Sequence, residues 1–261
     1  MLIVVSPAKA LDFESKLPTK KHSQPELLDR SRRLVDIMAA KSPDDLSEMM
    51  SISPALAELN FERFQDWSTP FTVDNARPAI LAFDGDTYTG LDARAGFGER
   101  DYTHAQKVLR ILSGLHGVLR PLDLIQPYRL EMGSRLEHDD GSDLYSFWGD
   151  EVTDRLNEAL EASPGAKVLV NLASNEYFSV VRPRRFDGRI ISPRFLDAKG
   201  DGEFKVVSFF AKQARGAMAG WMIRERITTI SALSDFDGLG YSYAAGESTA
   251  DAPVFTRRND A

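Results

Sequence analysis

The chain of 261 residues contains no cysteine, which excludes disulfides, zinc–thiolate sites, iron–sulfur clusters, thiol nucleophiles and thiol redox sensors. No apolar run approaches the roughly 18–20 residues of a membrane-spanning helix. The segment from Met1 to Lys9 has neither the basic region nor the length of apolar sequence that a signal peptide needs. The sequence therefore predicts a cytoplasmic protein with no membrane partner.

Familiar catalytic and metal-binding signatures are also missing. The stretch from Gly85 to Gly90 has two glycines of a phosphate-binding loop but lacks its lysine, and Gly-x-Ser-x-Gly does not occur. We predict that the protein binds no metal and no cofactor, although distant segments can still assemble a metal site. The histidines are too far apart for a local metal motif, at His22, His104, His116 and His138.

An excess of acidic residues gives the chain a formal net charge of −7, which by itself argues against nucleic-acid binding. The basic residues, however, are unevenly distributed. Residues 181–226 contain eleven Lys and Arg against five Asp and Glu, and residues 104–135 contain five against two. Such basic islands are typical of a protein that offers one face to a polyanion, and equally of ordinary solvated surface.

Apolar periodicity and turn residues predict strands and helices that interleave along the chain. We expect a mixed α/β (α+β) fold in which helices flank one central mixed sheet, as a single domain over residues 1–261. The predicted strands cover residues 2–5, 78–83, 128–132, 167–172, 189–196 and 204–210, with short ones near 240–243 and 254–256. The predicted helices cover residues 25–40, 54–67, 103–113, 144–160 and 211–227. The predicted core of the strands includes Ile3, Val5, Leu81, Val168, Val170 and Val206.

Two segments follow predicted buried strands, where open α/β sheets bind their ligands. Lys9 comes after the first strand and would place a mobile cation there. Ser174 follows the strand at 167–172 and is a natural N-cap for a helix whose free N–H groups would attract an anion. A lysine in water and an ordinary helix cap are the alternatives.

The run from Leu112 to Pro121 resembles a helix-hairpin-helix element of DNA-repair proteins. In such elements glycine permits a tight turn, and free backbone N–H groups contact a phosphate without reading bases. We therefore predict DNA contacts at Gly114 and Gly117, with Arg120 beside them. The glycines are spaced differently from the usual pattern, and an ordinary helix stop is the alternative.

A further group of cations would line a basic cleft. Lys212 and Arg215 are three residues apart on a predicted helix and share one face. Neighbouring aromatic residues would suit base stacking, although most of them fit a core: Tyr177, Phe178, Phe186, Phe209 and Phe210. The cations predicted to contact DNA in this cleft are Arg182, Arg184, Arg185, Lys212 and Arg215, and Arg129 is predicted to contact DNA as well.

Six blocks of sequence, in chain order, resemble the YaaA peroxide-stress family. Together they span essentially the whole chain. They are residues 6–11 (SPAKAL), 83–91 (FDGDTYTGL), 112–132 (with LRPLD and PYRLEM), 144–148 (LYSFW), 170–178 (VNLASNEYF) and 211–216 (AKQARG).

The resemblance implies a cytosolic bacterial protein that serves defence against hydrogen peroxide, limits free iron and protects DNA. It also implies DNA binding, a novel α/β fold, a positively charged cleft and a helix-hairpin-helix element. No catalytic residue is established for the family, so none is carried over. Because cysteine is absent, such a protein is neither a thiol peroxidase nor a thiol sensor.

Two functional hypotheses follow from these observations. The first is a protein of the oxidative stress response that binds duplex or structured DNA without sequence specificity. The second is an enzyme that acts on a nucleotide, a nucleic acid or a small anionic metabolite at the strand ends. Its candidate residues are Lys9, Tyr88, Glu131, Asn171 and Glu176. The sequence leaves the oligomeric state open, a monomer included.

Overall fold

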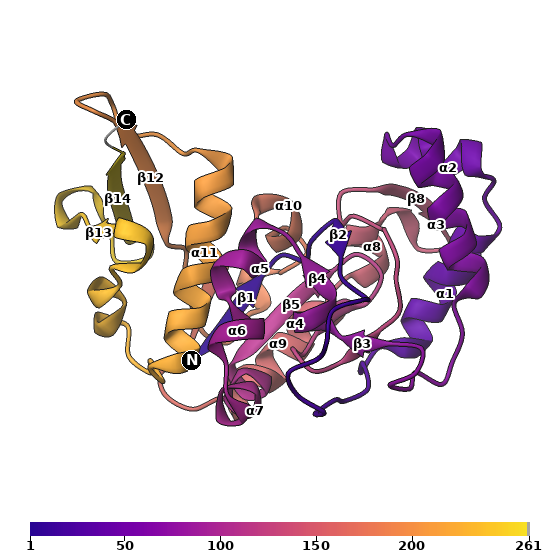
Figure 1. The fold of residues 1–261 in the computed structure, drawn as a ribbon, viewed down its shortest axis with the longest axis horizontal. Helices are drawn as coiled ribbons and strands as arrows, with labels where there is room; N and C mark the ends of the chain where they lie inside the picture. The colour runs from indigo at the N-terminus through magenta and orange to yellow at the C-terminus, as the bar shows by residue number, and fades with distance from the viewer. Residues whose placement is uncertain (260–261) are drawn as a thin grey trace.

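A five-stranded sheet forms the centre of the protein, in a computed structural model that describes residues 1–259 (Figure 1). The strand order is β11-β10-β1-β5-β6, in which the first four strands are parallel and β6 runs antiparallel to β5. Ile3 of the middle strand is level with Val170 on one side and Leu109 on the other. The strands are β1 (Leu2–Val5), β5 (Leu109–Ser113), β6 (Gly117–Leu119), β10 (Val168–Leu172) and β11 (Arg189–Ile191).

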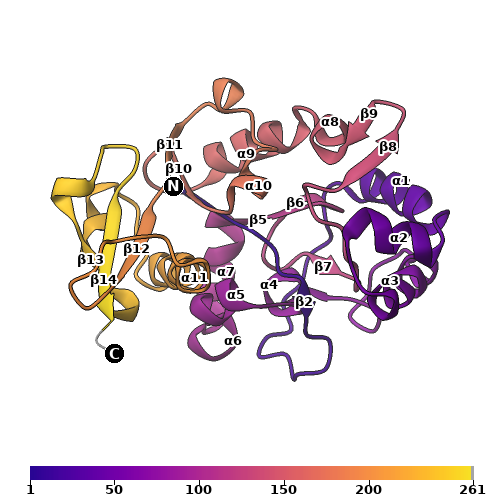
Figure 2. The same cartoon turned by 90° about the horizontal axis from the view of Figure 1, so that it is seen from above.

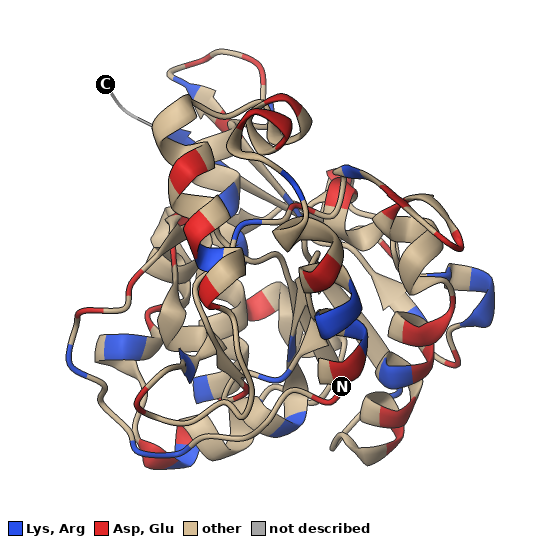
Figure 3. Cartoon of the chain, turned by 90° about the vertical axis from the view of Figure 1, so that its right-hand side faces the viewer, with Lys and Arg blue, Asp and Glu red and all other residues tan. Residues whose placement is uncertain are grey.

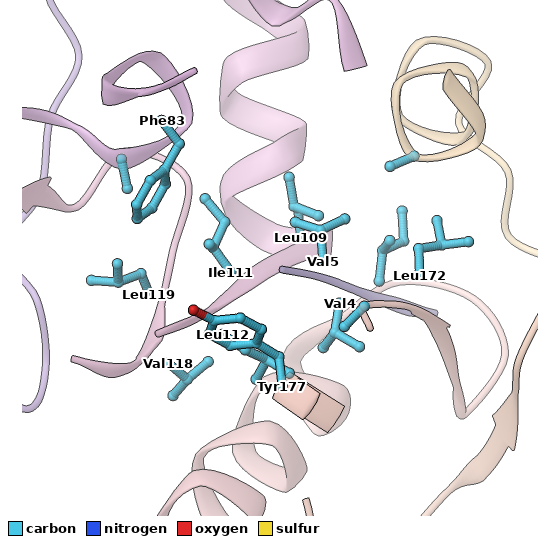
Figure 4. Packing of buried hydrophobic residues seen from close by; sticks show 14 of the residues in the cluster. Val4, Val5, Phe83, Leu109, Ile111, Leu112, Val118, Leu119, Leu172 and Tyr177 are labelled. Carbon is cyan, nitrogen blue, oxygen red and sulfur yellow. The ribbon is translucent and has the colours of Figure 1, made fainter. Parts of the chain in front are cut away.

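Helices cover both faces of this sheet, which explains why β1 and β10 are nearly continuous apolar runs. In Figure 2, α8, α9 and α10 lie on one side of the sheet, and α4, α5 and α11 lie on the other. Buried side chains of β1, β5 and β6 pack in one cluster with Phe83 and Tyr177 (Figure 4). These helices are α4 (Ala79–Ala82), α5 (Asp86–Leu91), α8 (Leu144–Trp148), α9 (Glu151–Ala162), α10 (Asn175–Phe178) and α11 (Ser208–Arg224).

Three helices pack together at one end of the molecule, at the right of Figure 1. Ser42 accepts the Asp45 N–H at the start of the second, and the Asp45 carboxylate accepts the Ser42 N–H at 2.8 Å, so this start is a capping box. The first and third helices confirm the predictions at residues 25–40 and 54–67. The three are α1 (Leu28–Ala39), α2 (Pro43–Met50) and α3 (Pro54–Asp66).

A second sheet of three strands lies at the opposite end, at the left of Figure 1. Aromatic rings join this sheet to α11. Phe195 stacks on Phe255, and the centroids of both rings lie within 6.1 Å of the ring centroid of Phe236. Phe236 in turn contacts Trp221 of α11. The buried carboxylate of Asp197 accepts hydrogen bonds from Tyr241 and Arg257. The strands are β12 (Arg194–Lys199), β13 (Ser242–Tyr243) and β14 (Val254–Asn259), and the last two confirm the short strands predicted there.

Short pairs of strands hold the remaining loops. In one of them Ala10 lies opposite Asp84, which brings the segment after β1 beside the start of α5. The pairs are β2 (Ala10–Leu11) with β4 (Phe83–Asp84), β3 (Arg77–Pro78) with β7 (Leu124–Ile125), and β8 (Arg135–His138) with β9 (Gly141–Asp143). Two further helices are α6 (Ala93–Gly96) and α7 (Glu99–Val108). Within residues 1–259 no helix is both long enough and apolar enough to span a membrane.

Glycines allow α5 and α11 to lie directly against each other. A Cβ added at Gly216 would lie 1.8 Å from the carbonyl oxygen of Thr87, and one added at Gly90 would lie 2.0 Å from that of Gln213. No larger residue fits at such a distance from a neighbouring backbone. The close packing places the loop before α5 beside the first turns of α11.

The segment predicted as a helix-hairpin-helix is a β-hairpin, so that expectation is not confirmed. β5 and β6 pair antiparallel across Gly114 to His116, and Ser113 lies opposite Gly117. Gly114 and Gly117 are buried against the Leu130 carbonyl and the Trp148 ring. The hairpin is a buried part of the central sheet, with β6 as an edge strand, and its glycines serve packing there. Sequence reasoning took the glycine turn as a link between helices, although the apolar run before it suits a buried strand equally well.

Several predicted elements differ in extent or type. The segment predicted as a strand at 78–83 forms β3, α4 and β4 in succession. The helix predicted at 103–113 ends at Val108, and β5 begins at the next residue. The helix predicted at 144–160 is divided into α8 and α9 at Gly149, whose φ is +53°. The strand at 189–196 is β11 and β12, separated by Ser192 and Pro193. No strand forms at 128–132, nor at 204–210, where α11 begins at Ser208. Of the predicted core residues, Leu81 is buried on a helix and Val206 is 56% exposed.

Candidate functional site

A pocket lies at the carboxyl ends of two neighbouring strands whose next strands lie on opposite sides of them in the sheet. β1 and β10 are adjacent and parallel, but the chain continues within the sheet from β1 to β5 on one side and from β10 to β11 on the other. Such a reversal of direction leaves a crevice outside the carboxyl ends of the strands, which is where open α/β sheets bind ligands. A cavity of about 450 Å³ occupies this position, and we call it the carboxyl-edge pocket. Its charged and hydroxyl-bearing lining residues are Ser6, Lys9, Asp84, Asp86, Thr87, Glu131, Ser174, Glu176, Tyr177, Lys212 and Arg215.

Hydrogen bonds between the two loops set the base of the pocket. The Ser6 hydroxyl accepts the Ser174 N–H at 2.9 Å, and the Tyr88 hydroxyl donates to the Ser6 carbonyl at 3.1 Å. Ser174 is the N-cap of α10, as predicted, because its hydroxyl accepts the Tyr177 N–H. This helix is a single turn of four residues, too short for a developed helix dipole, so the expected anion site at its N-terminus has no such basis.

Two glutamates line one part of the pocket, and both are already engaged. The Glu131 carboxylate lies 2.7 Å from Lys9 Nζ and 3.0 Å from a guanidinium nitrogen of Arg129. The Glu176 carboxylate accepts the Gly133 N–H at 3.0 Å. These contacts join the loop after β1, the segment after β7 and the start of α10.

Two cations on α11 line another part of the pocket without a partner. Lys212 and Arg215 are one turn apart on the helix and therefore share a face, as predicted. Within residues 1–259 neither side chain makes a hydrogen bond or an ion pair. Arg215 is partly buried, and this desolvation lowers the pKa of its guanidinium. A half-buried cation with no counter-charge is electrostatically suited to receive an anion.

The five residues proposed for an enzyme fall into two groups. Lys9, Glu131 and Glu176 line the carboxyl-edge pocket. Tyr88 and Asn171 instead stabilise the loops after the strands. Tyr88 donates to the Ser6 carbonyl after β1, and Asn171 accepts the Ala173 N–H after β10 and donates to Ser192. Burial raises the pKa of the Tyr88 phenol well above its usual value, so the phenol stays protonated at neutral pH.

The arginines before β11 are largely matched by nearby acids. Arg185 lies 2.7 Å from the Asp154 carboxylate, and Arg182 and Arg185 each lie 3.6 Å from Asp150. Arg184 is exposed, and none of the three lines the carboxyl-edge pocket. The positive charge of Arg182 and Arg185 is therefore compensated at the start of α9 rather than joined to that of Lys212 and Arg215.

Two cations of the basic island at residues 104–135, Arg120 and Arg129, are also paired. Arg120 lies 2.9 Å from the buried Asp123 and 3.0 Å from Glu26, and Arg129 lies 3.0 Å from Glu131. Over the face that carries α1 to α3, basic and acidic residues are interspersed (Figure 3). Of the residues predicted to contact DNA, Lys212 and Arg215 are those that line the carboxyl-edge pocket.

Sequence reasoning did not single out Asp84 and Asp86 as site residues. Both line the pocket, and within residues 1–259 neither makes an ion pair. The sequence did contain a signal for them, because they flank Gly85 in a turn within one of the blocks that resemble the peroxide-stress family.

The aromatic residues considered for base stacking differ in their exposure to solvent. Tyr177 and Phe186 are buried, whereas Phe209 is 50% exposed, one turn before Lys212 on α11.

A comparison with protein families agrees with the resemblance noted in the sequence. The family model described as "Peroxide stress protein YaaA" matches residues 1–247. This range contains the whole central sheet and every residue that lines the carboxyl-edge pocket. The chain belongs to the YaaA family of peroxide stress proteins.

Proposed function

We propose that this protein serves the peroxide stress response in the cytoplasm by binding DNA without sequence specificity, with the α11 side of the carboxyl-edge pocket as its contact surface. The observation that carries the proposal is the pair Lys212 and Arg215, two neighbouring cations that have no partner within residues 1–259. Free cations of this kind bind phosphate oxygens, which carry most of the affinity for DNA and no sequence information.

One further observation supports a nucleic-acid ligand. Phe209 is half exposed and lies one helical turn from Lys212, so an aromatic ring and a cation share one surface. This combination binds unpaired bases and their phosphates together. The other basic groups considered, at Arg120, Arg129 and Arg185, are neutralised by carboxylates and add little to attraction at a distance.

DNA binding gives a route to protection that needs no thiol and no redox centre. Ferrous iron is held by oxygen ligands, and DNA phosphates offer such ligands. A phosphate that contacts Lys212 or Arg215 is no longer available to iron, so peroxide chemistry is kept away from the covered strand. We propose that the protein limits damage from free iron in this way.

The proposal is tested by the double variant Lys212→Ala/Arg215→Ala. We expect its affinity for duplex DNA to fall at least tenfold, equally for two unrelated sequences, because phosphate contacts do not read bases. The matched control, Arg182→Ala/Arg185→Ala, removes the same charge from arginines that already face Asp150 and Asp154, and it should retain the wild-type affinity. Equal affinity of the first variant and the wild type would show that Lys212 and Arg215 are solvated bystanders.

A second candidate function is an enzyme that acts on a nucleotide or small anionic metabolite in the same pocket. The observation that favours it is the presence of Lys9, Glu131 and Glu176 beside the free cations. Carboxylates and a lysine at the carboxyl ends of parallel strands are the groups that general acid–base chemistry uses. Turnover of a nucleotide by the wild type that is lost in Glu176→Gln, with binding retained, would support this candidate.

A further inference from the structure

The carboxyl-edge pocket contains acidic side chains that the binding of a DNA backbone does not use. Asp84 and Asp86 both line it, and within residues 1–259 neither makes an ion pair. The Glu176 carboxylate, which accepts one backbone N–H, also faces this space. Carboxylates repel the phosphates of a strand that runs past them. The pocket is therefore not built as a groove for a continuous backbone.

The dimensions of the pocket also argue for a small occupant. Its volume of about 450 Å³ lies within the range of small-molecule sites. A cavity of this size accepts one nucleotide taken out of a stack, and it excludes a double helix. Contact with duplex DNA is then confined to the rim, where Lys212 is exposed and Arg215 is partly exposed.

The pocket's unpaired cations and two of its unpaired carboxylates lie on opposite sides of the contact between α11 and α5. Lys212 and Arg215 belong to α11, whereas Asp84 and Asp86 lie just before and at the start of α5, which packs on α11 through Gly216. A ligand that satisfies both groups carries an anionic group for the cations and hydrogen-bond donors for the carboxylates. A nucleotide has both: a phosphate, and the amino, ring N–H or hydroxyl groups of its base and sugar.

We propose that the carboxyl-edge pocket binds one nucleoside monophosphate unit, with its phosphate at Lys212 and Arg215 and its donor groups at Asp84 and Asp86. This inference rests on the proposed function, because an unpaired nucleotide of a bound DNA strand supplies such a unit. A free nucleotide has the same chemistry, and the two sources are separated by experiment.

The first experiment measures binding by calorimetry with dAMP, dCMP, deoxyadenosine and inorganic phosphate as separate probes. We expect both nucleotides to bind at least tenfold more tightly than phosphate or the nucleoside. The variant Asp84→Asn/Asp86→Asn should lose at least tenfold in nucleotide affinity while phosphate binding stays equal or strengthens. Asp139→Asn, at a side chain 98% exposed on the β8–β9 turn, is the control and should bind as the wild type does. Phosphate binding as tight as nucleotide binding would overturn the proposal, and so would a double variant with unchanged nucleotide affinity.

The second experiment identifies the source of the nucleotide. A duplex with one unpaired 2-aminopurine should change its fluorescence on binding the wild type, and this change should disappear in Asp84→Asn/Asp86→Asn while the affinity for DNA persists. Binding of dAMP with no fluorescence change assigns the pocket to free nucleotides. If DNA binds but neither signal appears, the pocket inference fails and the proposed function stands. If nucleotides bind but DNA does not, the proposed function fails and the pocket inference stands.

Discussion

The ammonium group of Lys9 lies 2.7 Å from the carboxylate of Glu131, so the one cation that follows β1 is already paired within the pocket. Arg129 lies 3.0 Å from the same carboxylate. Lys212 and Arg215, which are far from Lys9 in the sequence, line the same pocket and have no such partner within the described chain, which is why we propose them rather than Lys9 as the phosphate contacts.

Removal of the Glu131 charge should release Lys9 for phosphate contacts. In Glu131→Gln we expect tighter DNA binding and a salt dependence of affinity that is steeper by up to about one unit, as for one added phosphate contact. The gain should vanish in Lys9→Met/Glu131→Gln, because Arg129, the other cation that Glu131 pairs with, does not line the pocket. Binding titrations over a range of salt concentrations provide the measurement. A single variant that binds DNA no better than the wild type would show that Lys9 cannot reach a phosphate.

The contact between α5 and α11 should tolerate no side chain at Gly216. We expect Gly216→Ala to lower the free energy of unfolding by more than about 3 kcal/mol, because the added Cβ would collide with the Thr87 carbonyl oxygen. Gly246→Ala is the control, since nothing lies within 4 Å of its added Cβ, and it should change stability by less than about 0.5 kcal/mol. Urea unfolding of both variants measures the difference, and similar stabilities would refute the packing argument.

The β5–β6 hairpin should matter for stability and not for DNA contact. Gly117 has a φ of +66°, and a Cβ there would lie 2.9 Å from the Trp148 ring. We therefore expect Gly117→Ala to lower the free energy of unfolding by about 2–4 kcal/mol. Its affinity for DNA, measured at a temperature where the variant is fully folded, should equal that of the wild type. A selective loss of DNA binding in a stable variant would show that this hairpin contacts DNA.

The buried His116 should make the protein sensitive to acid. Burial lowers the pKa of His116 to about 3, whereas in the unfolded chain it is near 6.5, so the unfolded state binds the extra proton. Stability from this group is complete above pH 6.5 and is lost as the pH falls from there toward 3, by about 1.4 kcal/mol per pH unit. In His116→Asn, which keeps an acceptor for Ser31, that part of the slope should be missing. Urea unfolding between pH 7 and 4 measures both slopes, and parallel curves would contradict the assignment.

The buried strands and the long helices were predictable because their patterns are local. Leu2–Val5 and Val168–Leu172 are apolar runs bounded by turn residues, and α1 and α3 have helical periodicity. The β5–β6 hairpin was not predictable, because the apolar residues of a short run such as 108–112 fit a helix and a buried strand equally well. Tertiary neighbours decide between the two, and here the neighbour is β1.

The candidate site was predictable in part for the same reason. The shared face of Lys212 and Arg215 follows from their spacing on one helix, and the ligand position of Lys9 follows from the strand before it. The neutralisation of Arg185 by Asp154 was not predictable, since the two residues belong to different elements that only the fold brings together. The same holds for Asp84, which reaches the pocket through the pairing of β4 with β2.

The salt dependence of DNA binding tests the central claim most directly. Each cation that neutralises a phosphate contributes about 0.9 to the slope of log affinity against log salt concentration for duplex DNA. We predict that Lys212→Ala/Arg215→Ala flattens this slope by about two units relative to the wild type, whereas Arg182→Ala/Arg185→Ala leaves it unchanged. Equal slopes for the wild type and Lys212→Ala/Arg215→Ala would contradict the account.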